Sequence, residues 1–317
     1  MMVTALLAEE VSALTNFLQY TFLGLQKGAV YATIALALVI IFRVSGNLNF
    51  TQGEMATFST FITWAIWGDG RVPIWAALAL SLVVSFALGA SIERLVIRPV
   101  SKKAAGNPLP IVIATIGLYL AFSALAPAIW GTDAKRFPTL FGEGSLSLAG
   151  ASISYQTLGT LAVLAVVVGL LFVLFQKTKI GLAMRGVASN AESASLVGVS
   201  VGSVLMLGWA LSSAMGCMAG ALTANVGLNG ALMIAPLIYA FAAATLGGFD
   251  SPAGAVVGGL IVGLVAEYSA DYLAEVPFTT ITFIGEQLRI FPAFLLILVV
   301  LLVRPQGLFG KPQVTRV

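Results

Sequence analysis

Residues 155–176, YQTLGTLAVLAVVVGLLFVLFQ, contain no charged side chain and are dominated by Leu, Val and Ala. A helix needs about 20 apolar residues to cross a hydrocarbon core roughly 30 Å thick, so this stretch predicts a membrane-spanning helix. Residues 108–130 and 205–235 are charge-free runs of the same kind. Over the whole chain 59% of residues are hydrophobic and only 9% are charged, which is too little charge to cover a soluble globule. The sequence therefore predicts an all-α polytopic membrane protein.

The other apolar segments complete a predicted set of about 8–9 transmembrane helices. The segments lie near residues 17–42, 50–68, 74–97, 108–130, 155–176, 203–226, 232–249, 254–274 and 287–303. The second and the seventh are short or broken by Gly and Pro, so we expect some helices to be broken or re-entrant. Because no soluble domain interrupts this pattern, residues 1–317 are expected to form a single transmembrane domain.

Basic residues gather in three regions, and the positive-inside bias predicts that these regions face the cytoplasm. The regions are residues 94–103, 177–185 and 304–316. The opposite connections carry mixed or acidic charge, at residues 9–10, 69–71, 133–143 and 275–286. With alternating crossings, the N-terminus is predicted to lie outside and the C-terminus in the cytoplasm.

The chain lacks the residue patterns that most enzymes and nucleotide hydrolases need. It has no G-x-x-x-x-G-K-[ST] phosphate loop, and the nearest match, residues 307–311, is followed by Pro312. It has no histidine, and its single cysteine, Cys217, lies in an apolar segment. These absences remove the common nucleophile, general-base and metal-ligand constellations. We therefore expect no catalytic residue, no metal site, no bound cofactor and no nucleic-acid partner for this chain.

A polar stretch, NLNFTQGE, begins at Asn47 and interrupts the apolar pattern. Irregular backbone at membrane depth is tolerated where protein or a water-filled cavity satisfies it, so Asn47, Asn49 and Gln52 are candidates to line a solute route. The alternative is that they cap the next helix, because Asn is a favoured cap and Glu54 suits a first turn. Glu54 and Glu267 are also the ionisable residues expected within or at the edge of the hydrocarbon, where such groups usually face a bundle interior.

A second polar segment, residues 177–201, lies on the side that the charges assign to the cytoplasm. It is too long for a minimal helix connection, and residues 188–197, ASNAESASLV, predict a short polar-faced helix closed by Gly198. Such a helix can dock into a partner protein. The alternative is an amphipathic helix that rests on the bilayer surface.

A glycine-rich helix is predicted at residues 254–274, where the G-x-x-x-G pattern starts at Gly254 and again at Gly259. Small residues at this spacing let helix backbones approach closely in a membrane. Close packing, rather than solute contact, is the expected role of Gly247, Gly248, Gly254 and Gly258.

Motifs along most of the chain resemble the LivH/LivM-type permeases of branched-chain amino-acid ABC importers, and more closely the LivH half. The matching residues, in family order, are Gly28, Tyr31-Ala32, Asn49-Phe50, Gly53-Glu54, Ile92-Glu93-Arg94, Arg98-Pro99-Val100, Gly181, Arg185, Ala194-Ser195-Leu196, Gly198, Gly247-Gly248, Ser251-Pro252, Gly254-Ala255 and RPQGLFG at 304–310.

This resemblance implies a multi-pass permease subunit in the cytoplasmic (inner) membrane. Its implied partners are a second homologous permease subunit, two cytoplasmic ATPase subunits that bind ATP and Mg²⁺, and an extracytoplasmic solute-binding protein. Residues 177–201 are similar to a degenerate coupling motif, through which ATP hydrolysis would move the spans. The implied coupling residues are Arg185, Asn190, Ala191, Glu192, Ala194, Ser195 and Gly198.

The chain departs from the family pattern at two places. The family stretch usually reads N-F-A-H-G-E, whereas this chain has Thr51 and Gln52, and Tyr239 stands where a lysine is frequent. Both places are expected to approach the pathway, so Tyr239 is a further candidate to line it. The sequence therefore leaves several solutes possible: branched-chain or other amino acids, urea, amides and aromatic acids. The alternative function is an ion-coupled secondary transporter or channel, which a dense intramembrane relay of charged residues would favour.

Overall fold

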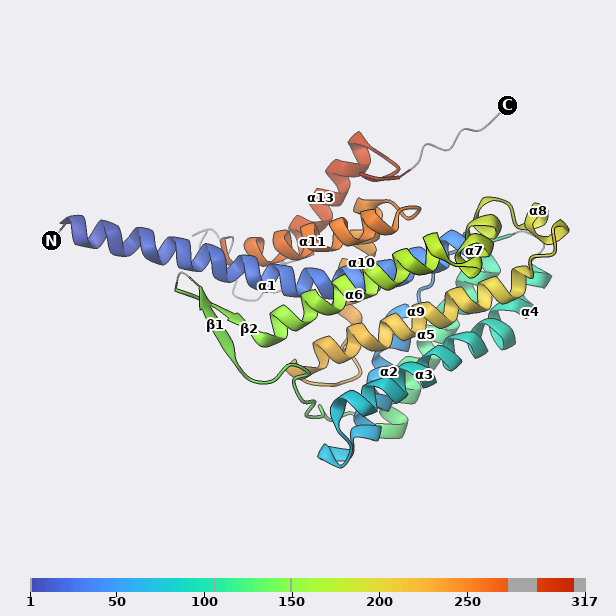
Figure 1. Cartoon of the computed structure of the whole chain (residues 1–317), viewed down its shortest axis with the longest axis horizontal. Coiled ribbons are helices and arrows are strands. Elements are labelled where there is room, and N and C mark those ends of the chain that lie inside the picture. Colours follow the sequence, from blue (N-terminus) through green and yellow to red (C-terminus); the bar gives the residue numbers. More distant parts are fainter. Residues whose placement is uncertain (1, 105–106, 149, 273–289, 311–317) are drawn as a thin grey trace.

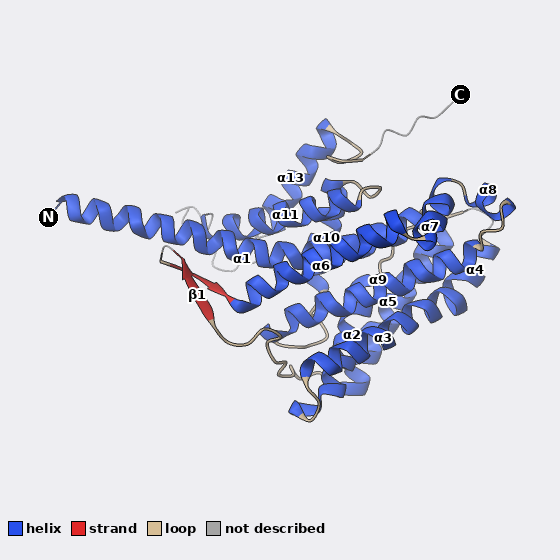
Figure 2. Ribbon diagram, viewed as in Figure 1, coloured by secondary structure: helices blue, strands red, loops and turns tan. Residues whose placement is uncertain are grey.

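The computed structural model describes residues 2–104, 107–148, 150–272 and 290–310, and these form a bundle of helices (Figures 1 and 2). The main helices are α1 (Met2–Ser45), α2 (Gln52–Trp67), α3 (Ile74–Ile92), α5 (Leu109–Trp130), α6 (Tyr155–Lys177), α9 (Val201–Thr223), α10 (Ile234–Gly247), α11 (Pro252–Tyr272) and α13 (Ile290–Val303). Short elements are η1 (Gly68–Gly70), the π turn η2 (Glu93–Ile97), α4 (Arg98–Lys103), α7 (Lys179–Ser189), α8 (Ala191–Leu196) and η3 (Ala224–Val226).

Each of the nine predicted apolar segments contains a helix, and six of the described helical stretches are long and apolar enough to cross a membrane. The remaining three, α2, α10 and α13, are shorter, with 16, 14 and 14 residues. The sequence had singled out the first two of these as short or broken. The protein is thus a multi-pass, all-α membrane protein in which long and short helices are combined.

The two ends of the bundle differ in charge and in structure. Helices α4, α7 and α8, which carry two of the predicted basic regions, lie together at one end (Figure 1). The start of α1 and an antiparallel hairpin of β1 (Ser145–Leu148) and β2 (Ala151–Ser154) lie at the other. The hairpin was not predicted. The predicted acidic connection at 275–286 and the basic residues Lys311 and Arg316 lie outside the described residues.

Helix α1 occupies the centre of the bundle and packs closely against α11 through glycines. A side chain on Gly28 would place its Cβ 2.9 Å from the Cα of Leu260, and one on Gly263 would collide with the backbone of Gly28. Gly259 meets Ala32 in the same way. The predicted G-x-x-x-G spacing therefore sets how closely α1 and α11 approach.

Replacing Gly28 with Leu is expected to destabilise the protein by about 1–3 kcal/mol or more, because the side chain has no space between two backbones. Thermal unfolding in detergent, followed by size-exclusion chromatography, measures the loss. Gly117→Leu in α5 is the matched control, since no atom of the described residues lies within 4 Å of a Cβ at that position. Equal unfolding temperatures for the two variants would contradict this account of the interface.

The other glycine face of α11 packs on α10, where Gly254 meets Gly247 and Gly258 meets Ala243. The segment after α13 then closes the end of α10. Leu308 N donates to Leu246 O at 2.8 Å, and Phe309 N donates to Gly247 O at 3.1 Å. Carbonyls that a helix end leaves without intrahelical partners are thereby satisfied, and this explains why RPQGLFG and the Gly247-Gly248 pair occur in one chain.

Candidate functional site

The polar turn between α1 and α2 starts at the surface and ends inside the bundle, since Gly46 is exposed whereas Asn49, Thr51 and Gln52 are buried. Gln52, the first residue of α2, is buried; its Nε2 donates to Ser212 O of α9 at 3.0 Å. Ser212 Oγ lies 2.7 Å from Gln52 Oε1 and 3.0 Å from Ala37 O of α1. Ala37 lies eight residues, or about 12 Å, before the end of α1, so the Gln52 side chain reaches Ser212 at a level well inside the bundle. The chain therefore folds back into the bundle, as the broken-helix interpretation predicted.

Asn49 and Thr51 hold the turn in place by local and long-range hydrogen bonds. Thr51 N donates to Asn49 Oδ1 at 3.0 Å, and Asn49 Nδ2 donates to Gln52 Oε1 at 3.2 Å. Thr51 Oγ1 donates to Thr115 O of α5 at 2.6 Å. Thr51, not an asparagine, is the N-cap of α2, and its side chain makes no cap hydrogen bond. Asn49 thus shapes the turn before the helix instead of capping it directly.

Glu54 is buried in the first turn of α2, with 3% of its surface exposed. Its Oε2 has no hydrogen-bond partner among the described residues. Beside it, Gly53 packs against the start of α10, because a Cβ there would lie 2.9 Å from Leu237 Cδ2 and 3.3 Å from Met233 O. The N-termini of two short helices, α2 and α10, therefore meet inside the bundle next to a buried carboxyl group. Helix N-termini carry partial positive charge and attract anionic groups.

The remaining pathway candidates do not all gather at this place. Tyr239 of α10 is buried and stacks on Tyr31 of α1, with ring centroids 4.8 Å apart. Glu267 of α11 forms an ion pair with Lys27 of α1 at 2.6 Å, towards the end of the bundle that contains the start of α1. Asn47 is half-buried, and its Nδ2 donates to Ser45 O at 2.6 Å.

The predicted coupling segment contains two helices, not one. The helix expected at 188–197 begins at Ala191, because Asn190 caps it: Ser193 N donates to Asn190 Oδ1 at 2.8 Å. The residues before it form α7, which Thr178 caps by accepting from Gly181 N at 3.0 Å. Gly198 has φ +87°, the positive value that its predicted closing role requires.

The outer surface of α7 and α8 is more apolar than the sequence indicated. Leu196 and Val197 are 84% and 80% exposed, and no sequence pattern marks either residue as an anchor for a partner. Ala191, Glu192 and Ser195 are also exposed, whereas Ala194 is buried. A groove of about 520 Å³ separates the two helices. Arg185, also implicated in coupling, donates from Nη1 to Gln176 Oε1 at 2.9 Å.

The sequence of this chain matches a known class of transport protein. Residues 20–303 match the family model described as "Branched-chain amino acid transport system / permease component", and the chain belongs to this family. The resemblance inferred from the sequence motifs is thereby confirmed.

Among its relatives, the chain is 30% identical to the high-affinity branched-chain amino acid transport system permease protein BraD of Pseudomonas aeruginosa, over 95% of this chain and 98% of BraD. It is 28% identical to the corresponding protein LivH of Salmonella typhimurium, over 95% of this chain and 98% of LivH. PsaBC from Streptococcus pneumoniae in complex with Fab is a solved structure with 17% identity and a TM-score of 0.46, covering 95% of this chain and 97% of that chain.

Proposed function

We propose that this chain is the permease subunit of an ABC importer for branched-chain amino acids in the cytoplasmic membrane. Family membership over residues 20–303 is the observation that carries the proposal. The partners would be a second homologous permease subunit, two ATPase subunits that bind ATP and Mg²⁺, and a solute-binding protein on the outside. In this arrangement the whole chain acts as one permease domain and performs no catalysis itself.

The orientation follows from charge. The end of the bundle with α4, α7 and α8 carries Lys102, Lys103, Lys177, Lys179 and Arg185, which supports a cytoplasmic position for that end. The start of α1 and the β1–β2 hairpin would then face the outside. The exposed Leu196 and Val197 would contact an ATPase subunit, since exposed apolar side chains that lie together mark protein interaction sites.

The solute route is proposed to pass the meeting point of α2 and α10. An α-amino acid carries one carboxylate and one ammonium group. The helix N-termini at Gly53 and Ile234 complement the first, and the carboxyl group of Glu54 complements the second. Asn49 and Gln52 would fix the start of α2, while Tyr239 would border the route beside Tyr31.

Reconstitution tests the assignment. The purified chain alone is expected to show no ATPase activity, whereas liposomes that also contain the ATPase subunits and the binding protein should hydrolyse ATP faster when leucine is added. Leucine uptake and phosphate release are measured together. Uptake driven by an ion gradient in liposomes that contain only this chain would overturn the proposal in favour of a secondary transporter.

A further inference from the structure

The long helical stretch from Ile74 to Lys103 contains a π turn, η2. Within it, the backbone N–H of Arg98 donates to Glu93 O, five residues earlier. In an α-helix, residues five apart point to different sides, since each residue turns the chain by about 100°. The π turn brings the two side chains onto one face, where they form an ion pair: Arg98 Nε lies 3.0 Å from Glu93 Oε1, and Arg98 Nη2 lies 2.6 Å from Glu93 Oε2.

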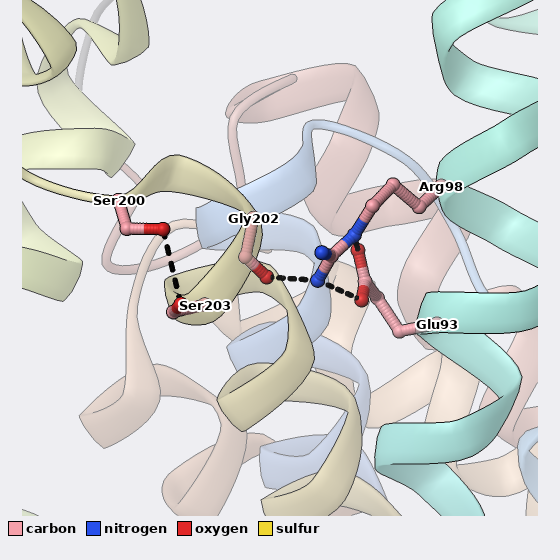
Figure 3. Close-up of polar contacts among 5 residues, drawn as sticks. All are labelled: Glu93, Arg98, Ser200, Gly202 and Ser203. Carbon is pink, nitrogen blue, oxygen red and sulfur yellow. Dashed lines mark hydrogen bonds and ion pairs between the residues drawn. The ribbon is translucent and has the colours of Figure 1, made fainter.

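The same guanidinium group also binds α9. Arg98 Nη2 donates to Gly202 O at 2.6 Å, so that it lies between the Glu93 carboxylate and a carbonyl near the start of α9 (Figure 3). Glu93 is only 1% exposed. A Cβ on Gly202 would lie 3.0 Å from Arg98 Cζ, so a glycine at this position lets the guanidinium approach. We call this three-residue arrangement of Glu93, Arg98 and Gly202 the clamp.

The clamp joins the start of α9, which follows the coupling segment, to η2, which continues α3. Only residues 197–200 separate the end of α8 from the start of α9, so a short connection links the coupling segment to Gly202. On the other side, η2 continues α3, which packs against α9; a Cβ on Gly89 would collide with Trp209 O.

A cavity of about 570 Å³ lies against the clamp. It is bordered by the turn before α2, by the clamp, by α8 and by α9, through residues that include Ser45, Asn47, Glu93, Arg98, Ala191 and Trp209. The packing of Gly89 on Trp209 ties α3 to α9 further along α9, whereas this open space lies beside the start of α9. Near that start, Arg98 adds a direct contact through Gly202 O.

We propose that Glu93 and Arg98 are positioning residues that transmit movement of the α7–α8 segment from the start of α9 to α3. The inference rests on the proposed function and extends it to residues outside the coupling segment. Glu93 holds the guanidinium group in place. When the start of α9 moves, the hydrogen bond from Arg98 to Gly202 O pulls on the π turn. Single π turns inside α-helices occur frequently at functional sites.

The test uses the complete complex in liposomes and measures leucine uptake and ATP hydrolysis in the same sample. Arg98→Gln is expected to leave ATP hydrolysis in place while leucine transported per ATP falls on the order of tenfold. Gly202→Ala should act in the same direction but more weakly, since it retains both charges and displaces only the guanidinium. Arg94→Gln is the matched control: Arg94 is exposed on the same turn, and the ratio should stay at the wild-type value.

Exchanging the two charges distinguishes loss of the contact with α9 from loss of the ion pair that stabilises η2. The double variant E93R/R98E restores an ion pair within η2, but a carboxylate at position 98 cannot donate to Gly202 O. We expect the complex to assemble as it does in the wild type and the transport ratio to remain low. A wild-type ratio in assembled complexes of Arg98→Gln, or full recovery of the ratio by the exchange, would overturn the proposal.

Hydrogen exchange at η2 gives a readout that does not depend on the solute. Binding of the ATPase with a non-hydrolysable ATP analogue should change exchange of the amides of residues 93–98 in the wild type and leave them unchanged in Arg98→Gln. If the wild type does not transport leucine, the proposed substrate is wrong. The hydrogen-exchange measurement then tests the clamp without the transport assay. Identical exchange in both proteins would refute the clamp even if leucine uptake is normal.

Discussion

Leucine uptake should fall by about ten- to a hundredfold when Glu54 is replaced by Leu, since a charge-assisted hydrogen bond to an ammonium group contributes about 1.5–3 kcal/mol. The protein should nevertheless remain folded. Glu54 is buried and its Oε2 has no partner within the described part of the chain, so removing this carboxyl relieves a desolvation cost and is expected to leave the unfolding temperature unchanged or raised. Transport assays in liposomes and thermal unfolding in detergent measure the two effects.

The competing role for Glu54 is to stabilise the first turn of α2, and it predicts the opposite pattern. Loss of an acidic residue near a helix N-terminus costs about 0.3–1 kcal/mol, so stability would fall while transport of the folded fraction stayed normal. Glu54→Gln retains size and removes charge, and should lose uptake with little change in stability. Glu143→Leu, at an exposed site in the connection before the hairpin, is the control.

Replacing Leu196 and Val197 together with Ser is expected to weaken ATPase binding by at least about tenfold, because full burial of a Leu or Val side chain contributes about 1.5–3 kcal/mol. Both side chains are exposed, so the double variant should insert and fold as the wild type does. Co-purification of the ATPase with the tagged permease measures the change, and leucine-stimulated ATP hydrolysis should fall with it.

Val226→Ser provides the control for that experiment, since Val226 is 82% exposed but lies in η3, before the turn that leads to α10. The bulkier change Ala194→Trp is a separate probe. Ala194 is buried in α8, so this variant should displace α8 from α7 and disturb coupling through the fold of the segment. Normal ATPase binding by the Leu196 and Val197 variant would remove α8 from the proposed interface.

The positions of the helices could be predicted from the sequence because bilayer thickness sets the length of an apolar run, and each predicted run contains a helix. The end of the coupling helix was also predictable, since Gly198 has the expected positive φ. Its start was placed three residues too early because the cap is Asn190, which ends one helix and begins the next. A run of helix-forming residues does not reveal such a break.

Contacts between distant residues could not be predicted from one sequence. Gln52 and Ser212 meet across two helices, and nothing in either local pattern specifies the partner. The hydrogen bond from Arg98 to Gly202 O likewise joins η2 and α4 to a helix about a hundred residues further along the chain, and no local pattern specifies it. Leu196 and Val197 lie in a segment whose composition indicates a polar helix, and only the fold shows that both point outward.

The closure of α10 by Leu308 and Phe309 has a consequence for the order in which the protein is made. Translation produces α10 and α11 long before residues 304–310 leave the ribosome, and chains acquire structure as they emerge. Until then the carbonyls of Leu246 and Gly247 lack these donors, so the glycine contact between α10 and α11 forms at an unfinished helix end. The end of α10 is therefore completed only when residues 304–310, the last described segment to be synthesised, have been added.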